Sequence, residues 1–204
     1  MRKVSATAGI LGPMLFAVVV VILTILQYRF MRSLGWDPIN KPTFDWPSGL
    51  ALGPIGWIMT VTFVVTGSLM SLFAWGLRGE LRNHTGQIGT ILMTWAGVAF
   101  MGLAFTTDPT ASITPIMPVT WHGRLHDLSF LALGLLLIPA MILLALSFGD
   151  VDRWKQLSAF TWVTFALAVP TFAIKGIVFY AFLAAMLAWS EAAALHLYQV
   201  SKSA

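Results

Sequence analysis

Six long apolar segments dominate this chain between Gly9 and Tyr198, and each is long enough to cross a lipid bilayer. A membrane-spanning helix needs about 20 consecutive, mostly apolar residues. Only 10% of the residues are charged, whereas soluble domains carry about 25%. A folded form therefore has too few polar side chains to cover its outer surface, and lipid is the solvent that suits it. We predict an integral membrane protein.

The segments predict an all-α, polytopic bundle of six transmembrane helices in a single domain. The second segment begins with Gly49 and Gly53, a small-xxx-small spacing that lets helices approach closely. Only Lys175 and Gly176 break the final run, which is too long for one crossing. Apolar runs between charged or Pro-rich interruptions place the helices at about residues 9–28, 49–77, 88–105, 125–148, 158–174 and 177–197.

The distribution of Lys and Arg predicts the orientation. Cytoplasmic loops carry an excess of these residues. With both termini inside, seven Lys and Arg residues fall on the cytoplasmic side and five on the other side. We therefore expect a multi-pass protein of the cell membrane with both termini cytoplasmic. The two long Pro-rich loops, about 29–47 and 106–121, then lie outside, where we expect them to pack together as a cap over the bundle.

Composition excludes several classes of function. The chain has no Cys, which excludes disulfides, thiolate metal sites and cysteine nucleophiles. The net charge is +4, but no Lys/Arg cluster or RNA-binding motif supports a nucleic-acid partner, and the basic balance fits membrane topology better. The expected partners are membrane lipid and a membrane-protein partner or a second copy of the chain.

Polar groups concentrate in the expected outer cap. Asp108 follows the third helix, and His122 and His126 begin the fourth. Two histidines four residues apart share one face of a helix. One interpretation is a structural role, in which these residues form a hydrogen-bonded cluster that ties two helix ends together. In that case an Asp–His pair should be strongest at mildly acidic pH, where an imidazole is charged.

The same three residues also permit an alternative in which they form a metal site. Asp108, His122 and His126 could be ligands of one zinc ion, with water in the fourth position as the nucleophile. The chain would then be a zinc-dependent intramembrane hydrolase acting on a lipid ester or amide. Against this alternative, His-x-x-x-His without a Glu inside it is only a moderate signal, and the other histidines, His84 and His196, fall on the opposite side.

Other candidates for ligand contact come from the helix ends and from one buried acid. Trp46, Trp121 and Arg124 lie in or beside the expected cap. Glu191 is the one acid well within an apolar stretch, and ionisable residues inside a membrane are functional candidates by default. Its alternative interpretation is structural: a protonated or Arg-paired carboxyl near the inner rim.

Three short motifs also suggest a family. They are Trp46-Pro-Ser-Gly-Leu-Ala-Leu-Gly53, Phe105-Thr-Thr-Asp-Pro109 and His122-Gly-x-x-His126. With them, nearly the whole chain resembles the prokaryotic six-helix membrane proteins catalogued as domain of unknown function 998. The resemblance implies the fold and no particular activity. A looser likeness, confined to one Asp and a His-x-x-x-His, is to alkaline ceramidases and adiponectin receptors. This chain lacks their third histidine and one of their helices.

These observations favour a non-enzymatic function. We expect the chain to bind a lipid or another hydrophobic ligand beneath the cap, or to act as a subunit of a membrane assembly. The outer face is rich in Trp, Pro and paired charges but lacks a complete catalytic set. No cofactor is expected on this interpretation, and zinc belongs only to the hydrolase alternative.

Overall fold

The computed structural model describes residues 2–41, 46–109, 120–173 and 178–202, with the backbone alone at 168–173 and 178. Over these ranges the chain is helical and contains no strand; its one isolated β-bridge joins Asp37 and Lys41. The elements in chain order are α1 (Arg2–Leu26), α2 (Tyr28–Ser33), η1 (Ser48–Leu52), α3 (Trp57–Arg78), α4 (His84–Gly102), α5 (Trp121–Asp150), η2 (Asp152–Trp154), α6 (Lys155–Ala173) and α7 (Val178–Lys202).

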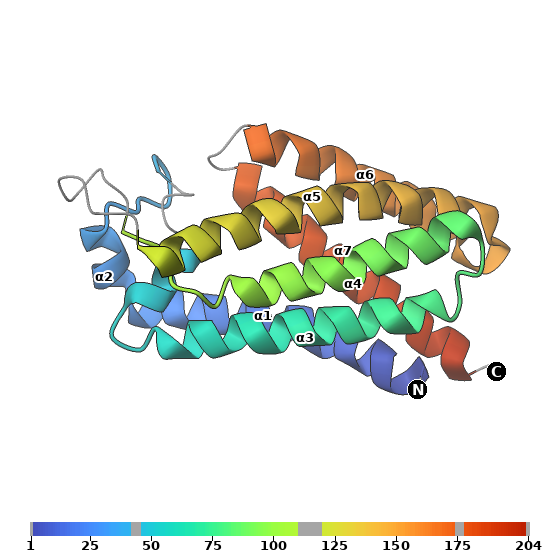
Figure 1. Ribbon diagram of the computed structural model, residues 1–204, viewed down its shortest axis with the longest axis horizontal. Helices are drawn as coiled ribbons and strands as arrows, with labels where there is room; N and C mark the ends of the chain where they lie inside the picture. The colour runs from blue at the N-terminus through green and yellow to red at the C-terminus, as the bar shows by residue number, and fades with distance from the viewer. Residues whose placement is uncertain (1, 42–45, 110–119, 174–177, 203–204) are drawn as a thin grey trace.

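The six long helices run along the long axis of the molecule and form a closed ring (Figure 1). Each of them packs against the next long helix in the chain, and α7 packs back against α1. Both chain ends lie at one end of the bundle, which we call the termini end. Helix α2 and η1 lie at the other end, which we call the loop end (Figure 1).

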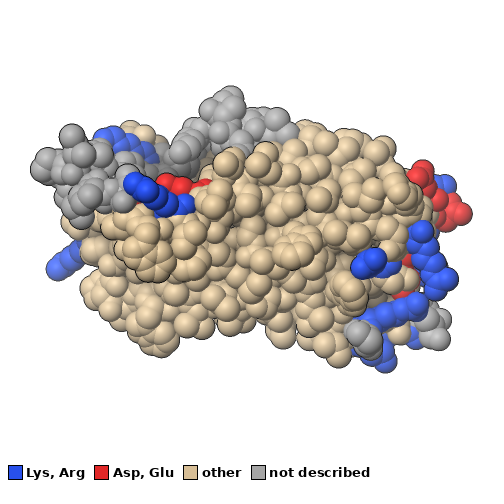
Figure 2. Space-filling model, viewed as in Figure 1, with Lys and Arg blue, Asp and Glu red and all other residues tan. Residues whose placement is uncertain are grey.

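The predicted all-helical architecture is confirmed, and four of the helices meet the requirements for a membrane span. These are α1, α3, α5 and residues Phe179–Lys202 of α7, judged by length and composition among the residues with described positions. In the face shown in Figure 2, charged side chains gather at the two ends of the molecule and leave an uncharged belt between them. This distribution is typical of a protein whose middle is in contact with lipid.

The prediction was wrong at the start of the second helix. Residues Gly49–Gly56 do not continue the helix, because η1 ends at Leu52 and α3 begins only at Trp57. Gly53 allows a close approach, but to Gln27 rather than to a neighbouring helix: a Cβ at Gly53 would collide with Gln27 Oε1. The Gln27 amide donates to the carbonyl oxygen of Leu50 (3.0 Å) and so fixes this loop against the end of α1.

The other predicted helices are present with shifted ends. Helix α1 starts seven residues earlier than expected, at Arg2, and α5 extends the predicted 125–148 at both ends. The break expected at Lys175 and Gly176 lies outside the described residues, between the end of α6 and the start of α7. Of the expected outer cap, most of the second loop, 110–119, also lies outside them.

A glycine pair other than the predicted one brings two helices together. A Cβ at Gly67 of α3 would lie 2.5 Å from the carbonyl oxygen of Gly97, and a Cβ at Gly97 of α4 would lie 2.7 Å from that of Gly67. Only glycine fits at both positions at this separation. Beside the pair, the Ser71 hydroxyl donates to the carbonyl of Gly67 (3.0 Å) or of Thr94 (2.9 Å). Small residues let membrane helices approach in this way.

The apolar packing differs between the two halves of the bundle. At the termini end, buried residues of all six long helices, among them Phe148 and Trp189, form one continuous cluster with Trp154 of η2. At the loop end, the buried cluster comes from α1, α2, α3, η1 and adjoining loop residues. Helices α5 and α7 contribute only partly buried residues there, such as Leu133 and Leu183. The loop-end half of the ring is therefore less completely filled.

Candidate ligand-binding cavity

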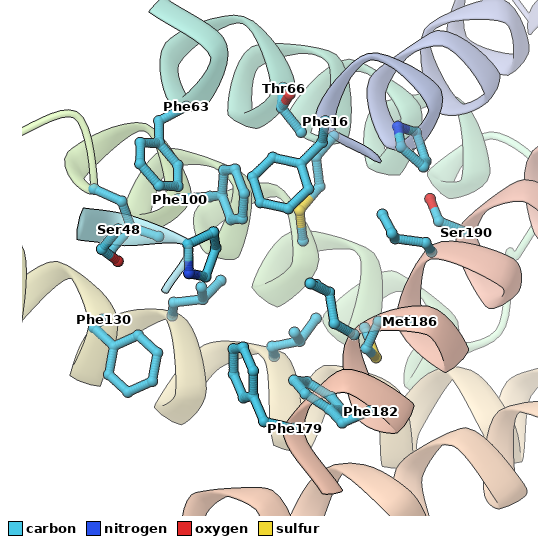
Figure 3. Close-up of a pocket in the computed structure, with 18 of the residues that line it drawn as sticks. Phe16, Ser48, Phe63, Thr66, Phe100, Phe130, Phe179, Phe182, Met186 and Ser190 are labelled. Carbon is cyan, nitrogen blue, oxygen red and sulfur yellow. The ribbon is translucent and has the colours of Figure 1, made fainter. Parts of the chain in front are cut away.

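A cavity of about 670 Å³ occupies the incompletely filled part of the ring. Its volume falls within the range of small-molecule sites, about 300–1,000 Å³. Aromatic rings face each other across it: Phe16, Phe63 and Phe100 on one side, and Phe179 and Phe182 on the other (Figure 3). Helices α1, α3, α4, α5 and α7 all line it, whereas none of the described residues of α6 does.

The deeper walls of the cavity are apolar. Rings from three helices form one wall, in which Phe16 packs against Phe63 (6.1 Å between centroids) and Phe100 (5.4 Å). The other apolar lining residues include Ala8, Gly9, Gly12, Pro13, Pro47, Met70, Met93, Leu103, Phe130, Leu133, Leu137, Leu183, Met186, Leu187 and Trp189. Such walls bind hydrocarbon by excluding it from water.

Polar groups gather around the cavity at the loop end. The loop before α3 contributes Asn40, Lys41 and Ser48, and Thr107 follows α4. The first turns of α5 contribute His126 and Asp127. Apolar walls with a few polar groups at one end suit a molecule that has a hydrocarbon body and a polar head.

Thr66 and Ser190 are exceptions to this distribution. Thr66 lies near the middle of α3 and lines the cavity, and its hydroxyl oxygen is buried without a hydrogen-bond partner among the described residues. Buried polar atoms in native proteins nearly always have a partner. A polar group of a bound molecule would supply one.

Trp46 closes the loop end beside α7. Its indole N–H donates to the Thr24 hydroxyl of α1 (2.9 Å). Its ring packs edge-on against Tyr180 (4.8 Å between centroids) and lies nearly parallel to Trp36 (6.5 Å). Trp46 itself lines the cavity. The position of Trp46 is thus consistent with the predicted contact between this side chain and a ligand.

Asp108 joins the end of α4 to the start of α5 through Thr120. The Thr120 hydroxyl donates to Asp108 Oδ1 (2.6 Å) and its backbone N–H donates to Oδ2 (2.9 Å). The same hydroxyl oxygen accepts from Gly123 N (3.1 Å), so Thr120 is the N-cap of α5. A Cβ at Gly123 would collide with the carboxylate. Asp108 therefore fixes where α5 begins.

The environment of Asp108 favours its charged form. The hydrogen bond from the Thr120 hydroxyl lowers the pKa of Asp108 below its ordinary value. The backbone N–H of Thr120 and the nearby charge of His122 lower the pKa further, whereas partial desolvation raises it. No hydrogen bond joins Asp108 to either histidine among the described residues. The Asp–His pairing expected from the sequence is thus replaced by an Asp–Thr pair.

Both histidines use Nδ1 to hold the end of α4. His122 Nδ1 donates to the carbonyl oxygen of Thr106 (2.9 Å) and lies 3.0 Å from Thr120 Oγ1. His126 Nδ1 donates to the carbonyl oxygen of Phe105 (2.7 Å) and lies 3.1 Å from that of Leu103. These carbonyls follow the last turn of α4, where no helical N–H is left to pair with them. The prediction of a hydrogen-bonded cluster that ties two helix ends agrees with this geometry.

The zinc alternative finds no support in this geometry. Among the described residues, no three His, Cys, Asp or Glu side chains are grouped so that they could hold one metal ion. Thr120 occupies both oxygens of Asp108, and Nδ1 of each histidine is directed at backbone carbonyls. The alternative stays a prediction that metal analysis of the purified protein would test.

Five of the seven predicted ligand contacts do not line the cavity: Asp108 and His122, which hold the helix ends, and three others. Trp121 is 68% exposed, Arg124 is exposed, and Glu191 is only partly buried; none of them lines the cavity. Glu191 Oε1 is shielded from solvent and has no hydrogen-bond partner in the described part of the chain. The arginine pairing considered for Glu191 is thus not seen there.

The sequence analysis missed most of the lining residues. Phe179, Phe182, Met186 and Ser190 of α7 recur at three- and four-residue spacing and face the cavity (Figure 3). That spacing was visible in the sequence. In a membrane helix, however, an apolar stripe toward lipid looks the same as one toward a cavity, so the pattern could not identify the site.

These features define a class: an all-helical membrane protein whose helix ring encloses an apolar, ligand-sized cavity. Comparison with known proteins supplies the family. The family described as "Protein of unknown function (DUF998)" matches residues 10–196, and the chain belongs to it. The resemblance read from the three motifs is thereby confirmed. No curated protein and no solved structure matches the chain.

Proposed function

We propose that this chain is a six-pass membrane protein that binds one lipid-like molecule in the cavity between α1, α3, α4, α5 and α7. The apolar cavity with polar groups at one end is the observation that supports the proposal. The hydrocarbon part of the ligand would lie between the phenylalanine walls, and its polar head would lie at the loop end. Binding of this kind needs no catalytic group.

The arrangement of the helices supports six crossings. Helices α3 and α5 both run from the loop end to the termini end, so the chain must return between them (Figure 1). Helix α4 makes that return, and α6 makes the equivalent return between α5 and α7. Each has 19 residues, about 28 Å of helix, close to the thickness of the hydrocarbon core, about 30 Å.

His126 indicates which kind of polar head group the loop end of the cavity would prefer. Its Nδ1 carries the proton, because the two backbone oxygens that it faces can only accept. In the neutral imidazole, Nε2 is therefore an acceptor. The neighbouring hydroxyls of Ser48 and Thr107 can donate or accept. This set favours a head group that presents a hydroxyl or an amine.

The first test fills the cavity. Leu133 lines the cavity, whereas Leu135, two residues along the same helix, is 67% exposed. Native mass spectrometry after gentle detergent extraction should show a lipid-sized adduct on the wild type and on Leu135→Trp, and a depleted adduct on Leu133→Trp. Equal adduct on both variants, or none on the wild type, would refute the proposal.

The second test removes the Thr66 hydroxyl group and keeps the shape of the side chain. Thr66→Val keeps the side-chain volume but removes the unpartnered hydroxyl. Stability of the ligand-free protein should stay the same or rise, because a buried unsatisfied polar group is lost. Ligand retention should fall by up to about tenfold, the equivalent of one hydrogen bond. Unchanged retention would show that Thr66 does not contact the ligand.

The proposed orientation places both termini in the cytoplasm and the loop end outside the cell membrane. It rests on the excess of Lys and Arg at the termini end. Asn40 is exposed at the loop end, so a tag there should be labelled only from outside intact cells. Labelling from the cytoplasmic side alone would reverse the orientation and leave the cavity proposal untouched.

A further inference from the structure

Glu80 lies in the short turn between α3 and α4 at the termini end, and its side chain is only 2% exposed. Arg2, at the start of α1, places its Nε 2.7 Å from Glu80 Oε1. Arg153, between α5 and α6, places Nη1 3.2 Å from Glu80 Oε2. One buried carboxylate thus forms ion pairs with two guanidinium groups from distant parts of the chain.

A second cavity of about 470 Å³ opens at this point. Its lining includes a third arginine, Arg82, which is exposed and makes no ion pair with the described residues. Asn83 also lines it and donates from Nδ2 to Asp150 (3.4 Å). Three guanidinium groups therefore surround the space, against the carboxylate of Glu80 and the more distant one of Asp150.

We propose that this arginine pocket, defined by Arg2, Arg82 and Arg153, binds a phosphate group that carries a net negative charge. Guanidinium groups match the oxygens of phosphate with paired N–H donors. Glu80 orients two of them in advance, which lowers the entropy lost on binding. The excess of positive charge is left for a ligand to neutralise.

The position of the pocket indicates where such a phosphate comes from. The pocket lies at the termini end, one of the two charged ends on either side of the uncharged belt (Figure 2). Basic pockets between membrane helices are recognised sites for anionic lipid head groups. A soluble phosphate compound presents the same chemistry, so the experiment must separate the two sources. The site is distinct from the apolar cavity and does not depend on its occupancy.

The experiment measures the melting temperature of the purified full-length chain and the lipid retained in native mass spectra. The probes are inorganic phosphate in detergent, and nanodiscs of phosphatidylcholine with or without phosphatidylglycerol or phosphatidic acid. Arg82→Gln is the test variant, because the Arg82 side chain makes no ion pair or hydrogen bond with the described residues. Arg124→Gln, an exposed arginine at the loop end, is the matched control.

We expect anionic lipid to stabilise wild type and Arg124→Gln, with binding at least about tenfold weaker in Arg82→Gln, as for the loss of one charged hydrogen bond. Stabilisation by inorganic phosphate as well would identify a site open to soluble phosphates; stabilisation by anionic lipid alone would identify a head-group site. Equal losses in both variants, or no preference for anionic lipid or phosphate, would overturn the proposal.

Discussion

Asp108→Asn is the substitution that most directly tests how the loop end is held together. The carboxylate accepts from both the hydroxyl and the backbone N–H of Thr120, at 2.6 and 2.9 Å. An amide has only one acceptor oxygen, so one of these bonds is lost and an NH₂ group faces a donor. Asn is nearly the same size as Asp, so packing against Gly123 is preserved.

The magnitude follows from the type of bond that is lost. A hydrogen bond to a charged group contributes about 1.5–3 kcal/mol to stability. Asp108 is partly exposed, so water can replace part of the loss, and we expect the free energy of unfolding to fall by about 1–2 kcal/mol. For a chain of this size that corresponds to a melting temperature lower by roughly 2–8 °C.

The pH dependence has a definite sign. The folded-state pKa of Asp108 is lowered from its ordinary value of 3.8. The stabilisation is therefore fully present above pH about 4 and is lost as pH falls through the folded-state pKa. This direction is opposite to that expected for an Asp–His pair, because the partner of the carboxylate is a hydroxyl that does not titrate.

Melting curves in a non-ionic detergent between pH 7 and pH 3 provide the assay. Wild type should lose stability over the acid range, and Asp108→Asn should start lower and lose less. Asp127→Asn is the control, since Asp127 is exposed and makes no hydrogen bond with the described residues. An Asp108→Asn protein as stable as Asp127→Asn at neutral pH, or a parallel acid loss in wild type and Asp108→Asn, would refute the reasoning.

Two further substitutions test the packing and the termini end. Gly67→Ala should lower the free energy of unfolding by about 1–3 kcal/mol, as overpacking does, because the new Cβ would lie 2.5 Å from a backbone oxygen of α4. Gly79→Ala is the control: its Cβ would lie 3.4 Å from the nearest atom, so the same melting assay should show little change. Glu80→Ala should cost about 1–2 kcal/mol rather than the 3–5 of a fully buried pair, because Arg2 and Arg153 are 43% and 56% exposed and can be hydrated. A loss above that range in chemical unfolding would mean that the arginines depend on Glu80 more than their exposure indicates.

Much of the fold could be predicted from sequence, because six apolar segments separated by polar turns specify six helices wherever the solvent is lipid. The prediction failed at the start of the second helix, where a hydrogen bond to the backbone holds the chain as a loop. Residues 49–56 are apolar enough for a membrane helix, but the loop accepts a hydrogen bond from the buried amide of Gln27. Nothing near Gly53 in the sequence shows that Gln27, in a different segment, will lie against it.

The candidate sites were less predictable for a related reason. Asp108, His122 and His126 stood out because they are polar residues at helix ends, and in the structure each makes hydrogen bonds that join the end of α4 to the start of α5. The cavity depends instead on an absence of packing between α5, α7 and the loop-end core, and no single residue encodes that absence. Thr66 shows the difference: a threonine in a membrane helix usually bonds its own backbone, as Thr62 does to Ile58 (2.7 Å).

The two ends of the molecule hold their helices in different ways, and the difference matches the position of the cavity. At the termini end, Glu80 in the α3–α4 turn pairs with Arg2 at the start of α1 and with Arg153 between α5 and α6. The apolar cluster at this end draws on all six long helices. At the loop end, hydrogen bonds join α4 to α5 and Trp46 joins α1 to α7. Neither set joins α5 to α7 directly, and these two helices form the cavity wall opposite the core. The cavity thus lies where the described hydrogen bonds and the loop-end core leave α5 and α7 unjoined, with α6 packing against both of them.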